Sequence, residues 1–472
     1  MKNKIDLTSG SIIVKLLIVA IPTLLTSIVQ MTYNLTDMFW VGRVGNMGLD
    51  PVEAISAVGT AGYFTWLGFG LILLAKVGTS ISVSQAAGRN DVDEITKVGN
   101  NGLILMLVLT AVYTFIGFFG AKIFIGLFNI DNINIKIYAF EYLRIISVFG
   151  FAYFITNSFN GIYDGLGKTI NTFYITASGL VLNIVLDPIF ILQDFGIFGL
   201  QFTGLGLGVK GAAIATGIAQ SFILATYLII YLSKYKPFTI NLKKYYDKTI
   251  FRKIMRIGLP VGTQSVFFTT ISIIIGIMIA SYGKHVMAVQ RVGSHIEALA
   301  WMIALGFQVA LASFVGQNYG AKRFDRIRKG YFISLKLLIP YGIIVNIILF
   351  VFAEQLFSIF VSDPETLAVG KMYLEILSIA QLFTVVELGT AGAFMGLGKT
   401  MIPSGVGIVG NSLRIPFAYL LALSLGFIGI WWVVAVSSIL KGIVLTVWFL
   451  LYLRKIKHSK MVLSWKINYH VI

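Results

Sequence analysis

The stretch VSQAAGRNDVDEI at residues 83–95 recurs as VGQNYGAKRFDRI at residues 315–327, and this recurrence decides the fold. A second match is identical, because the pentapeptide GLGKT stands both at 165–169 and at 396–400. The two pairs keep the same order along the chain, and the members of each pair lie about half a chain length apart. Ordered matches of this kind indicate that the second half of the chain is a copy of the first.

A third, weaker match completes the pattern. The heptapeptide NIVLDPI begins at Asn183, and NSLRIPF begins at Asn411. The offsets of the three matches are 232, 231 and 228 residues. Each copy has room for six membrane spans, and because six is an even number, both copies enter the membrane in the same direction. The duplication is therefore a parallel repeat, related by an axis along the membrane normal.

Composition places the chain in a membrane. Of its 472 residues, 57% are hydrophobic and 12% are charged, and the mean hydropathy is +0.86. Apolar runs recur from end to end, and each is near the roughly 20 residues that cross a hydrocarbon core. We predict an all-α polytopic membrane protein with twelve transmembrane helices in two six-helix lobes. Such a pair of lobes implies a cavity that opens to either side of the membrane.

The predicted domains follow from the repeat and from the basic loops. An N-terminal lobe covers residues 1–233, a basic connector 234–256, a C-terminal lobe 257–453 and a tail 454–472. The connector, the tail and other loops rich in Lys and Arg fall on one side in a twelve-span count. The positive-inside rule then places both termini in the cytoplasm, with the protein in the cytoplasmic (inner) membrane. Phosphate lipids, and no nucleic acid, account for the net charge of +17.

Several classes of function are disfavoured. Cysteine is absent, which removes thiol chemistry, and the four histidines show no metal-ligand spacing. GLGKT lacks the glycine five residues before Gly-Lys that a phosphate loop requires. No segment is polar and long enough for a separate soluble domain, so we expect no ATPase subunit. We predict a protein that is no enzyme, has no cofactor and works as a monomer.

Acidic residues inside spans are the strongest functional signal. A charge there costs roughly 2.5–3.5 kcal/mol on insertion scales and usually marks an ion or substrate pathway. The first half contains two such residues, Asp37 and Asp187. Asn183 lies four residues before Asp187, so the amide and the carboxylate share one helix face. Pro188 cannot donate to the carbonyl of Ile184, which leaves the backbone there free to bend or to coordinate.

Two further polar residues stand on neighbouring spans. They are Asn160 in TNSFNGIYDG and Thr216 in GAAIATGIAQ. Carboxylate, amide and hydroxyl oxygens are hard ligands that suit Na⁺ or a proton relay. The structural alternative is that these groups only hold helices together by interhelical hydrogen bonds. For Asn160 or Thr216 alone the two readings are evenly balanced.

Several of these motifs together resemble those of a known family. The stretches that carry the resemblance are YNLTDMFWVGRVG from Tyr33, IEALAWMIALGFQVALASFVGQNYGA from Ile296, LDPI, GLGKT and LRIPFAYLL. They are similar to the signatures of multidrug and toxic compound extrusion (MATE) transporters, and most closely to the DinF-like prokaryotic branch. The resemblance implies a two-lobed H⁺ or Na⁺ antiporter that exports organic cations and other amphiphiles by alternating access.

The resemblance also implies roles for individual residues. In that branch a polar network in the N-terminal lobe handles the coupling cation. The matching positions here are Asp37, Asn160, Asn183, Asp187 and Thr216. A coupling Na⁺, if that is the ion, is expected at Asp37, Asn183 and Asp187. The first span is expected to bend at its proline, Pro22, and the fifth span has its own candidate bend at Pro188.

The second half departs from another branch of the family, which carries an acid in the seventh span and one in the tenth. The seventh span here contains no acid, only Gln264, and the tenth contains Glu387. At the position that matches Asp187 the second half has Ile415, with Arg414 beside it. We therefore expect the ion site in the first half only.

Glu387, Glu297 and Gln264 are instead candidates for a cavity that attracts cationic substrate. For Glu297 the favoured role is a pairing with Arg291 or His295 near the end of its span.

Three other functions are compatible with a polytopic membrane protein. A flippase for lipid-linked precursors, from the same superfamily, is the first alternative, and it calls for a markedly basic cavity. The in-span cations available for that purpose are Lys76, Arg414 and Lys441. A membrane-embedded acyltransferase needs a catalytic His with an acid or nucleophile, and no such pairing is visible. A channel is disfavoured because both halves would have to form one continuous pore.

Overall fold

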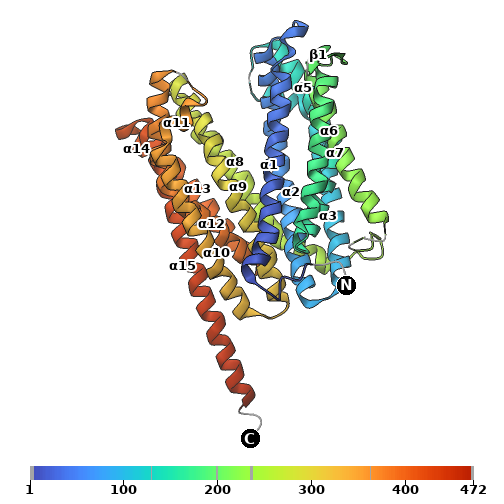
Figure 1. The fold of residues 1–472 in the computed structure, drawn as a ribbon, viewed down its shortest axis with the longest axis vertical. Coiled ribbons are helices and arrows are strands. Elements are labelled where there is room, and N and C mark those ends of the chain that lie inside the picture. The colour runs from blue at the N-terminus through green and yellow to red at the C-terminus, as the bar shows by residue number, and fades with distance from the viewer. Residues whose placement is uncertain are drawn as a thin grey trace. The chain divides into compact units, whose positions relative to one another are not determined.

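The computed structural model describes residues 5–128, 130–197, 200–233, 236, 238–361 and 363–468. The first four residues, the start of the predicted connector at 234–235 and the end of the predicted tail at 469–472 lie outside this description. Within the described chain, twelve helices are long and apolar enough to cross a membrane. The prediction of an all-α protein with twelve transmembrane helices is confirmed (Figure 1).

The elements of the first half come in the following order along the chain. They are α1 (Ile12–Val41), the 3₁₀ helix η1 (Val44–Met47), α2 (Pro51–Arg89), α3 (Val92–Phe119), α4 (Ala121–Gly126), α5 (Ile133–Gly165), α6 (Thr169–Ile191), β1 (Asp194–Ile197), β2 (Leu200–Thr203) and α7 (Val209–Leu232). Those of the second half are α8 (Lys248–Ala280), α9 (Lys284–Gly320), α10 (Phe324–Val351), α11 (Ala353–Ser358), α12 (Pro364–Gly396), α13 (Met401–Ser412), α14 (Arg414–Leu425) and α15 (Phe427–Asn468).

The chain forms two compact units. Unit 1 consists mainly of residues 21–83 and 91–262, and unit 2 of residues 6–20, 84–90 and 263 onward. In unit 1, α5 packs on α3 and α7, and α6 packs on α7. In unit 2, α12 lies at the centre and packs on α9, α10 and α15, while α14 packs on α15.

The repeated motifs adopt the same backbone conformation in both halves. Gly167 and Gly398, the second glycines of the two GLGKT copies, have φ of 75° and 74°. This left-handed conformation favours glycine and ends a helix. Asn90 and Lys322 occupy equivalent places in the longer motif and have φ of 60° and 58°. The duplication read from the sequence is therefore visible in the backbone, and GLGKT is a helix terminus.

The two halves differ where the third motif falls. In the first half, α6 continues through Pro188 without interruption. In the second half the matching span is divided into α13 and α14, and α13 ends at Ser412. Pro416 lies four residues later and has no N–H to donate to the Ser412 carbonyl, which is consistent with a helix end there.

A short antiparallel pair of strands lies between α6 and α7. Strands β1 and β2 are antiparallel, with Asp194 opposite Thr203 and Phe195 opposite Phe202. The two phenylalanine rings stack with centroids 5.6 Å apart. Such a cross-strand aromatic pair stabilises a two-stranded ribbon that lacks other strands.

Candidate functional site

The two predicted acids of the first half meet inside unit 1. Asp37 lies near the end of α1 and Asp187 near the end of α6, with exposed fractions of 7% and 0%. Asn183 connects them, because its Nδ2 donates to Asp187 Oδ1 over 2.8 Å and to Asp37 Oδ1 over 3.4 Å. The spacing of four residues sets Asn183 and Asp187 on one face of α6, and α1 supplies the second carboxyl group.

A third helix, α7, closes the group. Thr216 Oγ1 donates to Asp37 Oδ2 over 2.9 Å, so both oxygens of Asp37 accept a hydrogen bond from a neutral side chain. Close packing of α6 makes this arrangement possible. A Cβ atom at Gly179 would lie 2.4 Å from Ile223 of α7 and 2.6 Å from the Tyr33 hydroxyl of α1. Glycine at this position lets the three helices approach.

Two oxygen atoms of this group are buried without a hydrogen-bond partner. They are Asn183 Oδ1 and Asp187 Oδ2. A buried acceptor left unpaired costs about 1–3 kcal/mol. The Asp187 oxygen is therefore suited to a proton, and both oxygens are suited to ligate a cation. Carboxylate and amide oxygens from Asp37, Asn183 and Asp187 are the hard donors that Na⁺ prefers. The donor set therefore fits either of the two coupling ions.

The charges of this group are not balanced by the protein in the described chain. None of the described ion pairs includes Asp37 or Asp187; those within unit 1 lie elsewhere, such as Lys76 with Asp164 at 3.5 Å. Two carboxyl groups in one buried site repel each other when both are ionised. A bound cation or proton removes that repulsion.

Asn160, the fifth predicted member, makes a different contact. It is 2% exposed and its Oδ1 accepts a hydrogen bond of 2.6 Å from the Tyr227 hydroxyl of α7. Among the described hydrogen bonds, none joins Asn160 to the other four residues. The structure thus brings together Asp37, Asn183, Asp187 and Thr216, with Asn160 connected to α7.

Two tyrosines beside the acids escaped the sequence reasoning. Tyr33 and Tyr142 are both 6% exposed, and both interact electrostatically with Asp37 and Asp187. The Tyr33 hydroxyl is buried without a hydrogen-bond partner. Tyr33 lies four residues before Asp37, the same spacing that identified Asn183 and Asp187, so this signal was present in the sequence. Tyr142 has no such signal.

The acids of unit 2 have cationic neighbours. Glu387 and Lys441 form an ion pair of 3.3 Å, and their side chains are 12% and 11% exposed. Glu297 is 5% exposed, accepts a hydrogen bond of 3.4 Å from Gln381 and is attracted by Arg414. The structure thus sets Glu297 beside Gln381, with Arg414 at longer electrostatic range, where the sequence reasoning had favoured Arg291 or His295.

The remaining predicted residues have local contacts. Gln264 lies against α13, because a Cβ atom at Gly407 would be 2.3 Å from its Nε2. Pro22 lies inside α1 and Pro188 inside α6, and both helices are continuous through their prolines. The Pro22 carbonyl accepts a hydrogen bond of 2.8 Å from Thr26 Oγ1.

Twelve apolar helices in two repeated halves, with buried acids inside a span, define a multi-pass membrane protein of the transporter type. The sequence profile of the MatE family matches two segments, residues 22–189 and 260–420, one in each half. The chain belongs to the MatE family of transporters.

Relatives and solved structures agree with this assignment. A protein named probable multidrug resistance protein NorM, from Thermotoga maritima, is 27% identical over 430 residues, which are 88% of each chain. The probable multidrug resistance protein YoeA of Bacillus subtilis is 27% identical over 428 residues, 87% of this chain and 88% of that one. A transporter of the MOP superfamily from Pyrococcus furiosus has the same fold, with a TM-score of 0.86 at 24% identity over 96% of this chain and 98% of that one.

Proposed function

We propose that this protein is a multidrug efflux transporter that exchanges H⁺ or Na⁺ for organic cations and other amphiphiles by alternating access. Two observations support drug-like amphiphiles as the exported substrate. Relatives that match most of the chain are named multidrug resistance proteins. Apolar spans surround the polar group, as suits amphiphilic substrates. These names favour drug export over the flippase for lipid-linked precursors.

The buried acid pair is the main support for cation coupling. Asp37 and Asp187 are bridged by Asn183 and have no cationic partner among the described ion pairs. One oxygen of Asp187 and the amide oxygen of Asn183 are buried without a hydrogen-bond partner. An inward-moving cation binds to this group and reduces its negative charge. The packing of α1, α6 and α7 around it then changes, and substrate leaves. Each elementary charge that crosses 100 mV supplies roughly 2.3 kcal/mol for this work.

The decisive variant is Asp187→Asn, which keeps the size of the side chain and removes its charge. In proteoliposomes with an imposed Na⁺ or H⁺ gradient, we expect this variant to lose gradient-driven efflux while inserting normally. Asp194→Asn is the matched control, because it makes the same chemical change at an exposed position on β1. Efflux that Asp187→Asn leaves unchanged would refute the acid pair as the coupling site. The gradient that drives efflux by the wild-type protein, of Na⁺ or of H⁺, identifies the coupling ion.

The proposed topology can be tested independently. We propose that both termini and the loop before α8 lie in the cytoplasm of a cell whose inner membrane holds the protein as a monomer. Because the natural chain has no cysteine, single cysteines can be introduced without a background. In intact cells, an impermeant maleimide should label Asp194→Cys on β1 and leave Lys244→Cys unlabelled. The reverse pattern would invert the topology.

A further inference from the structure

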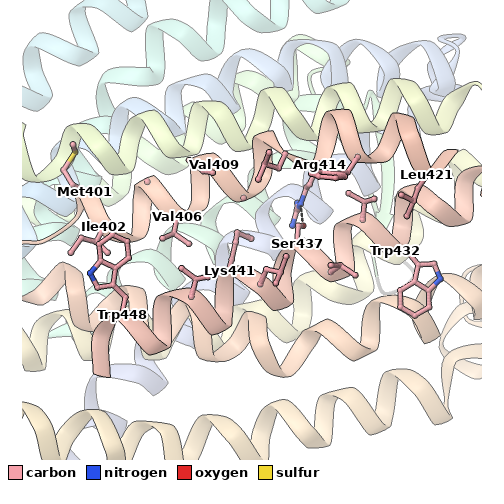
Figure 2. Close-up of a pocket in the computed structure, with 18 residues that line it drawn as sticks. Met401, Ile402, Val406, Val409, Arg414, Leu421, Trp432, Ser437, Lys441 and Trp448 are labelled. Atoms are coloured by element: carbon pink, nitrogen blue, oxygen red, sulfur yellow. Dashed lines mark hydrogen bonds between the residues drawn. The ribbon is translucent and has the colours of Figure 1, made fainter. Parts of the chain in front are cut away.

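A groove in unit 2 lies outside the acid pair and has no part in the proposed coupling. One wall is formed by α13 and α14 and the other by α15 (Figure 2). Its volume is about 820 Å³ and its lining is almost wholly apolar. Trp448 lies at one end with Met401, and Trp432 at the other with Leu421. Apolar residues on its rim, such as Val409, Phe417 and Leu440, are half or more exposed.

Two glycines of α13 explain why a groove forms here. A Cβ atom at Gly410 would lie 2.5 Å from the Lys441 side chain, so the helices are in direct contact at that level. Gly405 also lines the groove, and a Cβ atom there would meet nothing within 4 Å. The space left by the missing side chain of Gly405 is therefore part of the groove.

A guanidinium group lies in the middle of this apolar lining. Arg414 is 9% exposed and donates from Nε to Ser437 Oγ over 2.7 Å and from Nη2 to Ser438 Oγ over 2.9 Å. Figure 2 shows it turned toward Ser437 between the two walls. Both partners are neutral, and none of the ion pairs in the described chain includes Arg414. Glu297 and Glu387 attract it only through longer-range electrostatics.

Such a cation is expensive inside a membrane and usually marks a ligand or ion site. Lys441, the second cation of the groove, already has Glu387 as its partner. Arg414 is thus the group with charge available for a ligand. Its planar fork of donors fits a carboxylate by two parallel hydrogen bonds. The groove is therefore complementary to a molecule with one anionic group and a long apolar body.

We propose that this groove binds a single-chain amphiphile with a carboxylate head, of the long-chain fatty acid type. The carboxylate bonds to Arg414, and the chain lies along α13 and α15 toward Trp448. Met401 is 13 residues from Arg414, or roughly 20 Å of helix, which gives an extended chain room. A phospholipid is the alternative occupant, and the quenching test below distinguishes it from the acid. Arg414 lies near the middle of the span 401–425, so the head group of either ligand has to enter the groove to reach it.

Tryptophan fluorescence provides the test, since Trp432 and Trp448 line the groove. Stearate brominated in mid-chain should quench the purified full-length protein in a saturable way. Its methyl ester should bind about tenfold more weakly, because it loses the charge-assisted bonds to Arg414. Arg414→Gln should abolish the difference between acid and ester. Equal affinity of acid and ester for the wild-type protein would overturn the proposal.

A second variant tests the site without touching its charge. Gly405→Leu fills the groove, and leucine is a better helix former than glycine, so the fold should tolerate it. We expect saturable quenching to be lost. Gly276→Leu is the matched control, because a Cβ atom there also meets nothing within 4 Å and the residue lies on α8, outside the groove lining. Quenching that Gly405→Leu leaves intact would exclude this groove. Brominated phosphatidylglycerol that binds as tightly as the acid would assign the groove to phospholipid and overturn the proposal.

Discussion

The two halves of this transporter descend from one repeat, yet their buried charges are organised in opposite ways. In unit 1, Asp37 and Asp187 are bridged by a neutral amide, and no described ion pair includes either of them. In unit 2, Ile415 stands where Asp187 would match, and Glu387 is paired with Lys441. Glu387 of unit 2 has a cationic partner in Lys441, whereas the acid pair of unit 1 has none among the described ion pairs, so an external cation can neutralise charge there. This difference is the physical basis for our proposal that cation coupling takes place in unit 1.

The largest expected effect on stability is in unit 2. Glu387→Gln leaves Lys441 buried without its partner, which typically costs roughly 3–5 kcal/mol. Asp187→Asn in unit 1 should cost nothing comparable, since it removes repulsion between two acids. Thermal unfolding of the purified variants measures both. The double variant Glu387→Gln/Lys441→Met should recover much of the loss. An Asp187→Asn protein as unstable as Glu387→Gln would erase the contrast between the units.

The hydrogen bond from Thr216 tests the role of neutral partners at the acid pair of unit 1. Thr216→Val keeps the shape of the side chain but removes the donor to Asp37 Oδ2. A hydrogen bond to a charged group contributes about 1.5–3 kcal/mol, so the ion concentration for half-maximal efflux should shift by about tenfold or more. Thr216→Ser should retain wild-type behaviour. A valine variant with unaltered ion dependence would remove Thr216 from the site.

Helix packing around the acids gives a smaller expected effect. Gly179→Ala introduces a Cβ atom 2.4 Å from Ile223 and 2.6 Å from the Tyr33 hydroxyl. Overpacking of this kind costs about 1–3 kcal/mol and displaces Tyr33 from the acid pair. Gly59→Ala is the control, because its new Cβ atom meets nothing within 4 Å. We expect a lower unfolding temperature for Gly179→Ala than for Gly59→Ala. Equal unfolding temperatures would show that α1, α6 and α7 can accommodate the added methyl group.

The smallest expected effect on stability concerns two helix caps at equivalent places in the repeat. Asn132 caps α5 in the first half, and Asp363 caps α12 in the second. Hydrogen bonds from the Thr366 hydroxyl and N–H lower the pKa of Asp363, with a further contribution from His285. Its stabilisation is therefore present above the ordinary carboxyl pKa and is lost as pH falls through the lowered value. In the Asp363→Asn variant, the free energy of unfolding should depend slightly less on pH across that acidic range than in the wild-type protein. Identical pH profiles for the two proteins would show that ionisation of Asp363 does not contribute to stability.

Sequence reasoning reached the parts of the site that local spacing determines. Asn183 and Asp187 share a face because they are four residues apart, and the structure joins them by a hydrogen bond. The approach of Asp37, 146 residues from Asn183, depends on how α1 packs against α6, which no local pattern encodes. Asp37 was a candidate as an acid in a span, and the family resemblance then placed it in one set with Asn183 and Asp187.

Other features were beyond the reach of pattern alone. Tyr33 had the right spacing from Asp37, but a tyrosine at a span end has many ordinary roles. The groove beside Arg414 depends on an empty space at Gly405, and a sequence does not say whether a glycine leaves space or is filled by a neighbour. The twelve spans and the repeat, in contrast, follow from length, hydropathy and motif order, which need no tertiary contact.

The central claim is tested most directly by ion movement in response to drug. Proteoliposomes loaded with a fluorescent organic cation are diluted into drug-free medium, and entry of radioactive Na⁺, or of H⁺ by a trapped pH dye, is recorded. We predict ion entry with the wild-type protein and with Glu297→Gln, and none with Asp187→Asn. Ion entry that persists in Asp187→Asn, or that only Glu297→Gln abolishes, would contradict coupling through the acids of unit 1.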